Sequence, residues 1–304
     1  MSEGFVGQLG AVDELGLEIT DEVRTLIRTA LDEDLRHGPD VTTAATVPAD
    51  AMTDAAIASR GAGVIAGLPV VLAVFDEVIG AGAYEVTSAV VDGTHVGPGE
   101  VVLGVHAPTG SLLTAERTAL NIICHLSGIA TATARWVAAV DGTAAQVRDS
   151  RKTLPGLRHL QKYAVRSGGG VNHRMGLGDA ALIKDNHVAA AGSVSAALSA
   201  VRAAAPGLPV EVEVDSLAQL DEVLALEPQL VLLDNFALWE TQMAVQRRNT
   251  RSPQTKLESS GGLTLDMAAD YARTGVDYLA VGALTHSVTA LDLGLDIAAP
   301  TPVN

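Results

Sequence analysis

The second half of the chain alternates short apolar runs with segments of helical spacing, and this alternation constrains the fold more than any other feature. Repeated strand–helix units build a parallel sheet covered by helices. We therefore predict a parallel α/β barrel, closed or open, over residues 129–285. The expected strands are 145–148, 181–184, 210–214, 230–233, 255–258 and 278–281. The expected helices are 156–167, 193–205, 217–226, 237–246 and 265–274.

Polar residues follow each expected strand, and in such barrels the chemistry lies at the carboxyl ends of the strands. The glycine-rich turns Ser260-Gly261-Gly262 and Gly282-Ala283 suit a phosphate, because their backbone N–H groups can approach it closely. Glu213 and Asp234 end neighbouring strands, and two carboxylates at a phosphate site hold Mg²⁺ or sugar hydroxyls. We expect them to face the cations Arg151, Lys152, His173, Arg174 and Lys184 from the other side of the site. This division predicts two substrates.

Charge is distributed unevenly along the chain. The net charge is −16, which argues against nucleic acid or an anionic membrane as partner. Residues 148–184 nevertheless hold eight of the twenty basic residues and only two acidic ones. This basic island indicates a small polyanionic ligand. The alternative for Arg158, Lys162 and Arg166 is a solvated helix face, because their spacing of four lines one side of a helix.

The first half predicts a different domain. A helix is expected at 21–36 and extended runs at 55–59, 84–91 and 101–105. A helical region from 112 to about 140 follows, with an expected break near Ser127-Gly128. We therefore divide the chain into an N-terminal α+β sandwich domain, residues 1–128, and the barrel, residues 129–285. The tail, residues 286–304, is expected to pack back on the first domain through 291–297, with 299–304 loose.

No stretch of the sequence predicts membrane insertion. The longest apolar run, 62–75, contains two Gly and one Pro and is shorter than the roughly 20 residues that span a bilayer. The N-terminus carries Glu3, Asp13 and Glu14 and no basic segment, so it does not resemble a secretory signal. We expect a cytoplasmic protein.

Residues 149–188, DSRKTLPGLRHLQKYAVRSGGGVNHRMGLGDAALIKDNHV, resemble the quinolinate phosphoribosyltransferase family, whose pattern runs DTRKT, PG, EKYAV, GGG, HR, LIKDNH. The departures Ser150 and Gln161 leave this resemblance intact. It extends to LLTAERTALN (112–121), EVEVDS (211–216), LLDN (232–235), ESSGG (258–262) and GVDYLAVGALTHS (275–287). The resemblance implies transfer of phosphoribosyl from phosphoribosyl pyrophosphate to quinolinate, with decarboxylation to nicotinate mononucleotide, pyrophosphate and carbon dioxide.

The resemblance also implies residue roles. Quinolinate would be bound by Arg117, Arg151, Lys152, His173, Arg174 and Lys184. The phosphoribosyl group would be held by Glu213, Asp234, Ser260, Gly261, Gly262, Gly282 and Ala283. Lys152, Lys184, Glu213 and Asp234 would serve catalysis, with Mg²⁺ carried mainly by pyrophosphate and Glu213 and Asp234 as its candidate ligands. Family members are homodimers in which Arg117 would enter the partner's site, and larger assemblies remain open.

Three alternatives remain at this stage. The nearest is a related pyridine or pyrophosphorylase-type transferase on the same fold. A second is a Schiff-base aldolase using Lys184 at a strand end, which the carboxylates Glu213 and Asp234 disfavour. The third is a protein that binds a dicarboxylate without turnover.

Overall fold

The computed structural model describes residues 16–297, so the expectation for 299–304 lies outside the described residues. The described chain forms two compact units. The first contains residues 16–132, 166–169 and 288–297, and the second contains 133–165 and 170–287.

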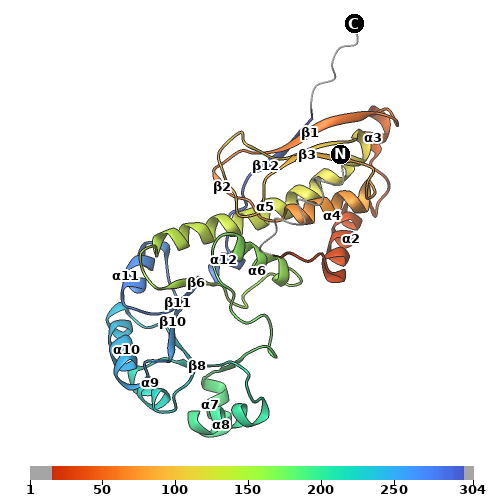
Figure 1. The fold of residues 1–304 in the computed structure, drawn as a ribbon. Coiled ribbons are helices and arrows are strands. Elements are labelled where there is room, and N and C mark those ends of the chain that lie inside the picture. The colour runs from red at the N-terminus through yellow and green to blue at the C-terminus, as the bar shows by residue number, and fades with distance from the viewer. Residues whose placement is uncertain (1–15, 298–304) are drawn as a thin grey trace. The chain divides into compact units, whose positions relative to one another are not determined.

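An antiparallel sheet organises the first unit (Figure 1). Its strands have the order β12-β1-β5-β3, so the segment β12 near the end of the chain pairs with β1. Phe75 and Val74 of α4 are buried in the core, and the helix start at Thr20 is capped by the Thr20 hydroxyl. The elements are α2 (Asp21–Leu35), α3 (Val41–Thr46), β1 (Met52–Ser59), β2 (Gly63–Val64), α4 (Leu68–Val78), β3 (Glu85–Ala89), β4 (His95–Val96), β5 (Val101–Pro108) and β12 (Leu293–Ile297).

The helix α5 (Thr109–Ala139) runs without interruption, so the expected break at Ser127-Gly128 is wrong. Gly128 is there for close packing, because a Cβ would clash with the main chain of Thr289 and Ala290. The Ser127 hydroxyl accepts a hydrogen bond from Ala66 N at 3.0 Å. Both residues that suggested a break therefore serve contacts within the first unit.

By length and composition alone, α5 could cross a membrane, which is weak evidence because core helices pass the same test. Its apolar residues Leu112, Ile123, Leu126 and Ile129 are at most 1% exposed in the folded chain. This burial is that of a core helix.

The second unit is built on a six-stranded sheet in which every pair is parallel, with the order β6-β11-β10-β9-β8-β7 (Figure 1). The first strand in the chain order, β6, pairs with the last, β11, as in a barrel. The two edge strands β6 and β7 do not pair, so the sheet is not closed. An isolated bridge from Arg148 to Val171 extends the β6 edge instead. The predicted parallel α/β architecture beside an N-terminal α+β unit is confirmed, with the barrel open between β6 and β7. The strands are β6 (Gln146–Arg148), β7 (Ala181–Ile183), β8 (Val210–Val214), β9 (Leu230–Asp234), β10 (Lys256–Ser260) and β11 (Tyr278–Ala280).

The helices of the second unit cover one face of its sheet. Residues with their side chains toward the helices, such as Val212, Val231 and Leu257, are fully buried, which the period of two in a strand requires. The helix α7 was not expected, because its segment reads as a polar turn after β7. The helices are α6 (Arg158–Ser167), α7 (Asp185–Ala191), α8 (Val194–Ala204), α9 (Leu217–Leu224), α10 (Leu238–Arg251), a 3₁₀ turn at Leu265–Met267, α11 (Ala268–Arg273) and α12 (Ala283–His286).

Candidate active site

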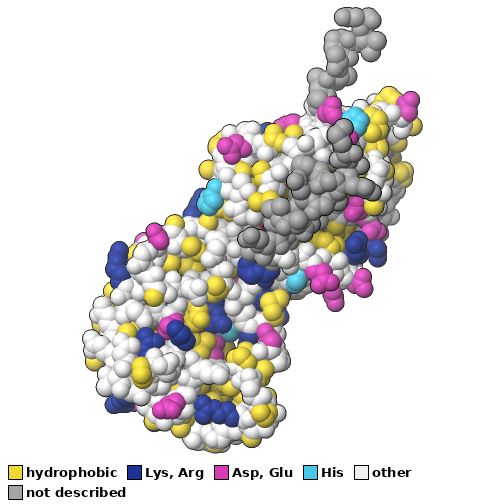
Figure 2. Space-filling model, viewed as in Figure 1, with side chains coloured by type: hydrophobic (Ala, Val, Ile, Leu, Met, Phe, Trp, Pro, Cys, Tyr) yellow, Lys and Arg dark blue, Asp and Glu magenta, His cyan; other side chains and the backbone are white. Residues whose placement is uncertain are grey.

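The other face of the sheet borders a cavity of about 510 Å³ at the carboxyl ends of the strands. Alternate strand residues line it, for example Leu182 and Lys184, or Glu258 and Ser260. Figure 2 shows basic, acidic and histidine side chains gathered on this part of the second unit. The lining residues predicted from the sequence are Arg151, Lys152, His173, Arg174, Lys184, Glu213, Asp234, Ser260, Gly261, Gly262, Gly282 and Ala283.

Arg117 is the predicted site residue that does not line this cavity. It lies on α5 in the first unit with its side chain 65% exposed, and it pairs only loosely with Glu116, at 4.0 Å. Its place in a partner's site therefore stays a prediction.

Two arginines belong to the cavity wall, Arg151 and Arg174. Their Nε atoms are buried and make no hydrogen bond within the described chain. Arg174 Nη1 donates to Ala180 O at 2.8 Å, which fixes the direction of its guanidinium. Forked guanidinium groups match carboxylates bidentately, so this pair of arginines suits a ligand with carboxylate groups.

Lys184 and Glu213 form an ion pair, so the expected division of cations and carboxylates onto opposite sides of the site is wrong for this pair. The register explains the contact: Ile183 of β7 lies opposite Val212 of β8, and the next residue of each strand is Lys184 and Glu213. Asp234 follows on the neighbouring strand β9, where its Oδ2 accepts from Asn235 Nδ2 at 3.0 Å.

The two glycine-rich turns lie where β10 and β11 end. Gly261 has φ +95°, a left-handed conformation, and a Cβ there would strike the Asn235 side chain, so only glycine fits. Gly282 precedes α12, close to Ser150 and Lys152. These turns expose backbone at the same rim as the cations.

A buried ion pair supports this rim from below. Lys162 is 0% exposed, and its Nζ lies 2.5 Å from Asp149 Oδ1 and 2.7 Å from His173 O. Asp149 also accepts from His173 N at 2.8 Å and from Asn172 Nδ2 at 2.6 Å. The solvated-face interpretation is therefore wrong for Lys162, because its side of α6 turns inward to the end of β6. Arg158 is half-buried, and its guanidinium donates to Thr153 Oγ1 and Met175 O.

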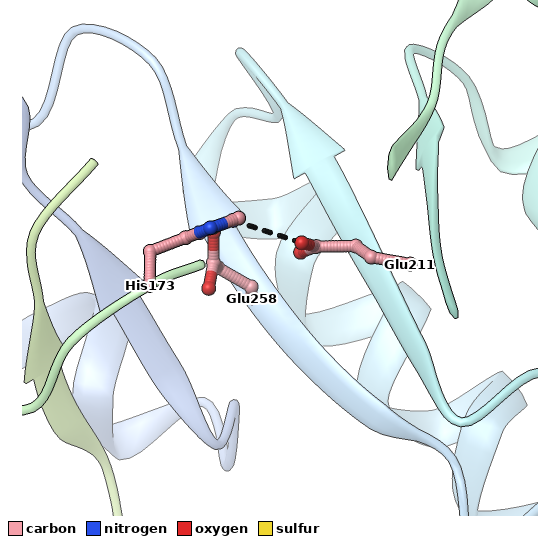
Figure 3. Close-up of side chains that lie close together, drawn as sticks. All are labelled: His173, Glu211 and Glu258. Atoms are coloured by element: carbon pink, nitrogen blue, oxygen red, sulfur yellow. Dashed lines mark ion pairs between the residues drawn. The ribbon is translucent and has the colours of Figure 1, made fainter. Parts of the chain in front are cut away.

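A second buried cluster in this unit is formed by side chains of β6, β8 and β10 and of the loop between α6 and β7. His173 Nε2 lies 2.9 Å from Glu211 Oε2 and 3.7 Å from Glu258 Oε1, and Figure 3 shows the three side chains converging. Arg148 Nη1 contacts Glu258 Oε2 at 2.7 Å and its guanidinium stacks over Tyr278. Burial raises the pKa of Glu211 and of Glu258 to about 7, and burial lowers the pKa of His173.

Sequence reasoning assigned no role to Arg148, Asp149, Lys162, Glu211 and Glu258. A signal was present in the strands: Glu211 and Glu213 alternate with valines in β8, and Glu258 precedes Ser260 by two residues in β10. Since alternate residues share a face, the lower carboxylates must point to the same side as the rim residues.

An open parallel α/β barrel with guanidinium groups, carboxylates and glycine turns at one rim defines a class of enzyme that binds an anionic ligand beside a phosphorylated one. The family models agree: residues 40–127 match the N-terminal domain of quinolinate phosphoribosyl transferase, and residues 129–296 match its C-terminal domain. The chain belongs to the quinolinate phosphoribosyl transferase family.

Individual relatives give the same result. The chain is 65% identical over 277 residues to the nicotinate-nucleotide pyrophosphorylase [carboxylating] of Mycobacterium leprae, covering 91% of this chain and 98% of that protein. It is 36% identical over 294 residues to the tobacco quinolinate phosphoribosyltransferase [decarboxylating] 1b, covering 91% and 83%. The crystal structure of the nicotinate-nucleotide pyrophosphorylase from Ehrlichia chaffeensis matches with a TM-score of 0.85 at 36% identity, covering 92% and 100%.

Proposed function

We propose that this protein transfers the phosphoribosyl group of phosphoribosyl pyrophosphate to quinolinate and decarboxylates the ring, giving nicotinate mononucleotide, pyrophosphate and carbon dioxide. The single observation that carries this proposal is the cavity in which Arg151, Arg174 and Lys152 lie beside the glycine turns of β10 and β11. The names of the relatives support the same reaction.

Quinolinate is a dianion, and its two adjacent carboxylates would pair with the guanidinium groups of Arg151 and Arg174 in the cavity wall. Lys152 lies beside Gly282, where it would reach both the ring and the phosphorylated sugar. Lys184 completes the cation set, with Glu213 holding its ammonium group in place. His173 belongs to the cavity wall.

The phosphoribosyl group would lie along the glycine turns of the same rim. Ser260, Gly261 and Gly262 after β10, with Gly282 and Ala283 before α12, would hold the 5′-phosphate. Asp234 and Glu213 would hold the ribose hydroxyls. Their carboxylate oxygens are also the ligand type that Mg²⁺ prefers, so Mg²⁺ entering with pyrophosphate would be accepted here and would neutralise charge on the leaving group.

The chemistry needs positioning more than covalent help from the chain. The pyridine nitrogen attacks C1′ of the ribose while pyrophosphate leaves, through a transition state with oxocarbenium character. Cations at the ring carboxylates orient the nitrogen, and carboxylates near the sugar stabilise the positive charge that develops. The alkylated nitrogen then accepts electron density as carbon dioxide leaves C2.

We further propose a cytoplasmic homodimer in which Arg117 of one protomer completes the site of the other. Arg117 is exposed and outside the cavity of its own second unit, which supports a role in another chain. Mixing inactive Arg117→Ala and Lys184→Ala proteins under subunit exchange should restore part of the activity, because some heterodimers regain one complete site. No recovery despite demonstrated exchange would contradict the shared site.

The reaction is tested by incubating the protein with quinolinate, phosphoribosyl pyrophosphate and Mg²⁺ and measuring carbon dioxide and nicotinate mononucleotide. Equal amounts of the two products are expected. Binding of quinolinate without turnover would favour the dicarboxylate-binding alternative. The aldolase alternative loses support because Lys184 is ion-paired and 45% exposed, whereas Schiff-base lysines are desolvated or set beside another cation.

A further inference from the structure

Decarboxylation leaves an electron pair on C2 of the ring, and nicotinate mononucleotide carries a hydrogen there. The proposed function therefore needs a proton donor at C2. Lys152 and Lys184 carry ammonium protons at the rim, and the buried carboxyl groups of the cavity wall are the other acids near it. The buried cluster of His173, Glu211 and Glu258 lies in and under the wall of the same cavity.

The hydrogen bonds of His173 indicate which of its two ring nitrogens carries the proton. The backbone N–H of Arg174 donates to His173 Nδ1 at 2.7 Å, so Nδ1 carries the lone pair. In the neutral ring the proton is then on Nε2, which points to Glu211 Oε2. With this tautomer the Nε2 proton lies between the ring and Glu211, so the histidine donates to the carboxylate.

The two oxygens of Glu258 differ in their surroundings. Oε2 is paired with Arg148 Nη1 at 2.7 Å. Oε1 is buried and makes no hydrogen bond within the described chain. A buried oxygen without a donor is costly as part of a carboxylate, but it is well suited to carry the proton of a carboxylic acid. Burial raises the pKa of Glu258 to about 7, so much of it holds that proton at neutral pH.

We propose that Glu258 is the acid that protonates C2 after carbon dioxide leaves, an assignment that rests on the proposed function. The bond between C2 and the carboxylate carbon breaks, and its electron pair stays on C2 beside the alkylated nitrogen. The proton on Glu258 Oε1 moves to C2, and the new carboxylate is stabilised by Arg148. Water restores the proton once the product leaves. His173 and Glu211 are positioning residues, because His173 lies beside Glu258 Oε1 in the cavity wall and pairs with Glu211.

Glu258→Gln tests this step because glutamine keeps the size and the contact with Arg148 but is no acid. In single turnover we expect pyrophosphate release within about 10-fold of wild type, and product formation slowed by about 10²-fold or more. Because carbon dioxide can recombine with a C2 that is not protonated, ribosylated quinolinate that still has both carboxylates should accumulate. The control is Asp270→Asn, which changes an exposed carboxylate of α11 outside the cavity and should keep pyrophosphate and carbon dioxide release in step.

The origin of the hydrogen gives a second readout. Product made in equal parts H₂O and D₂O should differ in its deuterium content at C2 between wild type and Glu258→Gln, because water replaces the carboxyl group as donor. Should the glutamine protein not fold, Glu258→Asp, which withdraws the acid by one methylene, should show the same uncoupling more weakly. Coupled release with unchanged deuterium content in an active, folded Gln or Asp variant would overturn the assignment. A wild type that makes no nicotinate mononucleotide would instead refute the proposed function.

Discussion

The rim of the parallel sheet and the layer beneath it contain the same kinds of side chain with opposite pairing. Below the rim, Lys162 is matched with Asp149, and Arg148 with Glu258. At the rim, Lys184 is paired with Glu213, but neither Arg151 nor Lys152 forms an ion pair within the described part of the chain. The lower layer therefore balances its own charge and holds the rim in position, while the rim leaves its positive charge for a ligand.

This comparison predicts strong discrimination against nicotinate as a substrate. It is the largest effect on kcat/KM that we expect. Nicotinate lacks the carboxylate at C2, so it would leave part of the unpaired rim charge without a partner. Sites built on polar pairing can reject an analogue that lacks the group by roughly 10⁴-fold. Competing kcat/KM measurements at equal Mg²⁺ and phosphoribosyl pyrophosphate check this. Comparable turnover of the two acids would favour a related pyridine transferase.

The second largest effect on activity should come from removing a cation of the rim. Arg151→Ala should lower kcat/KM for quinolinate by about 10³-fold, because truncating one partner of a buried charge pair costs about 3 to 5 kcal/mol. Its stability should change little. The control is Arg273→Ala, an exposed arginine paired with Asp270 on α11. Arg158→Ala is a poorer control, since Arg158 bonds to Met175 O. Equal activity of the two variants would show that the rim charge is not used.

Sequence reasoning reached the rim more completely than the lower layer. Each rim residue follows a strand, so the strand pattern places it at one edge once the sheet is known to be parallel. The pairing of Lys184 with Glu213 needed the register of β7 and β8, which the sequence does not reveal. A solvated face stayed open as the alternative for Lys162, because helical spacing tells which residues share a face, not which way that face points. Gly128 suggested a helix break because its packing neighbour, Thr289, is distant in sequence.

The lower layer should matter for stability. Lys162→Met should reduce the free energy of unfolding by about 3 kcal/mol or more, because it leaves Asp149 charged and buried without its partner. Adding Asp149→Asn should recover part of the loss, since the buried charge is then gone. Urea unfolding monitored by circular dichroism measures both. An additive loss in the double variant would mean that the two residues do not act as a pair.

The smallest effect concerns the pH dependence of stability. The pKa of Glu258 is raised from 4.5 to about 7, so the folded chain holds this proton more tightly than the unfolded chain does. The resulting stabilisation is complete below pH 4.5 and is lost as the pH rises to about 7, by at most about 3 kcal/mol at 1.36 kcal/mol per pKa unit. His173 works in the opposite direction below pH 6.5, because its pKa is lowered. Comparison with Glu258→Gln isolates the glutamate: between pH 5 and pH 8, wild type should lose stability relative to the variant in urea unfolding. A difference that stays constant with pH would mean that Glu258 is already ionised at pH 5, which would also remove the proton that the decarboxylation step requires.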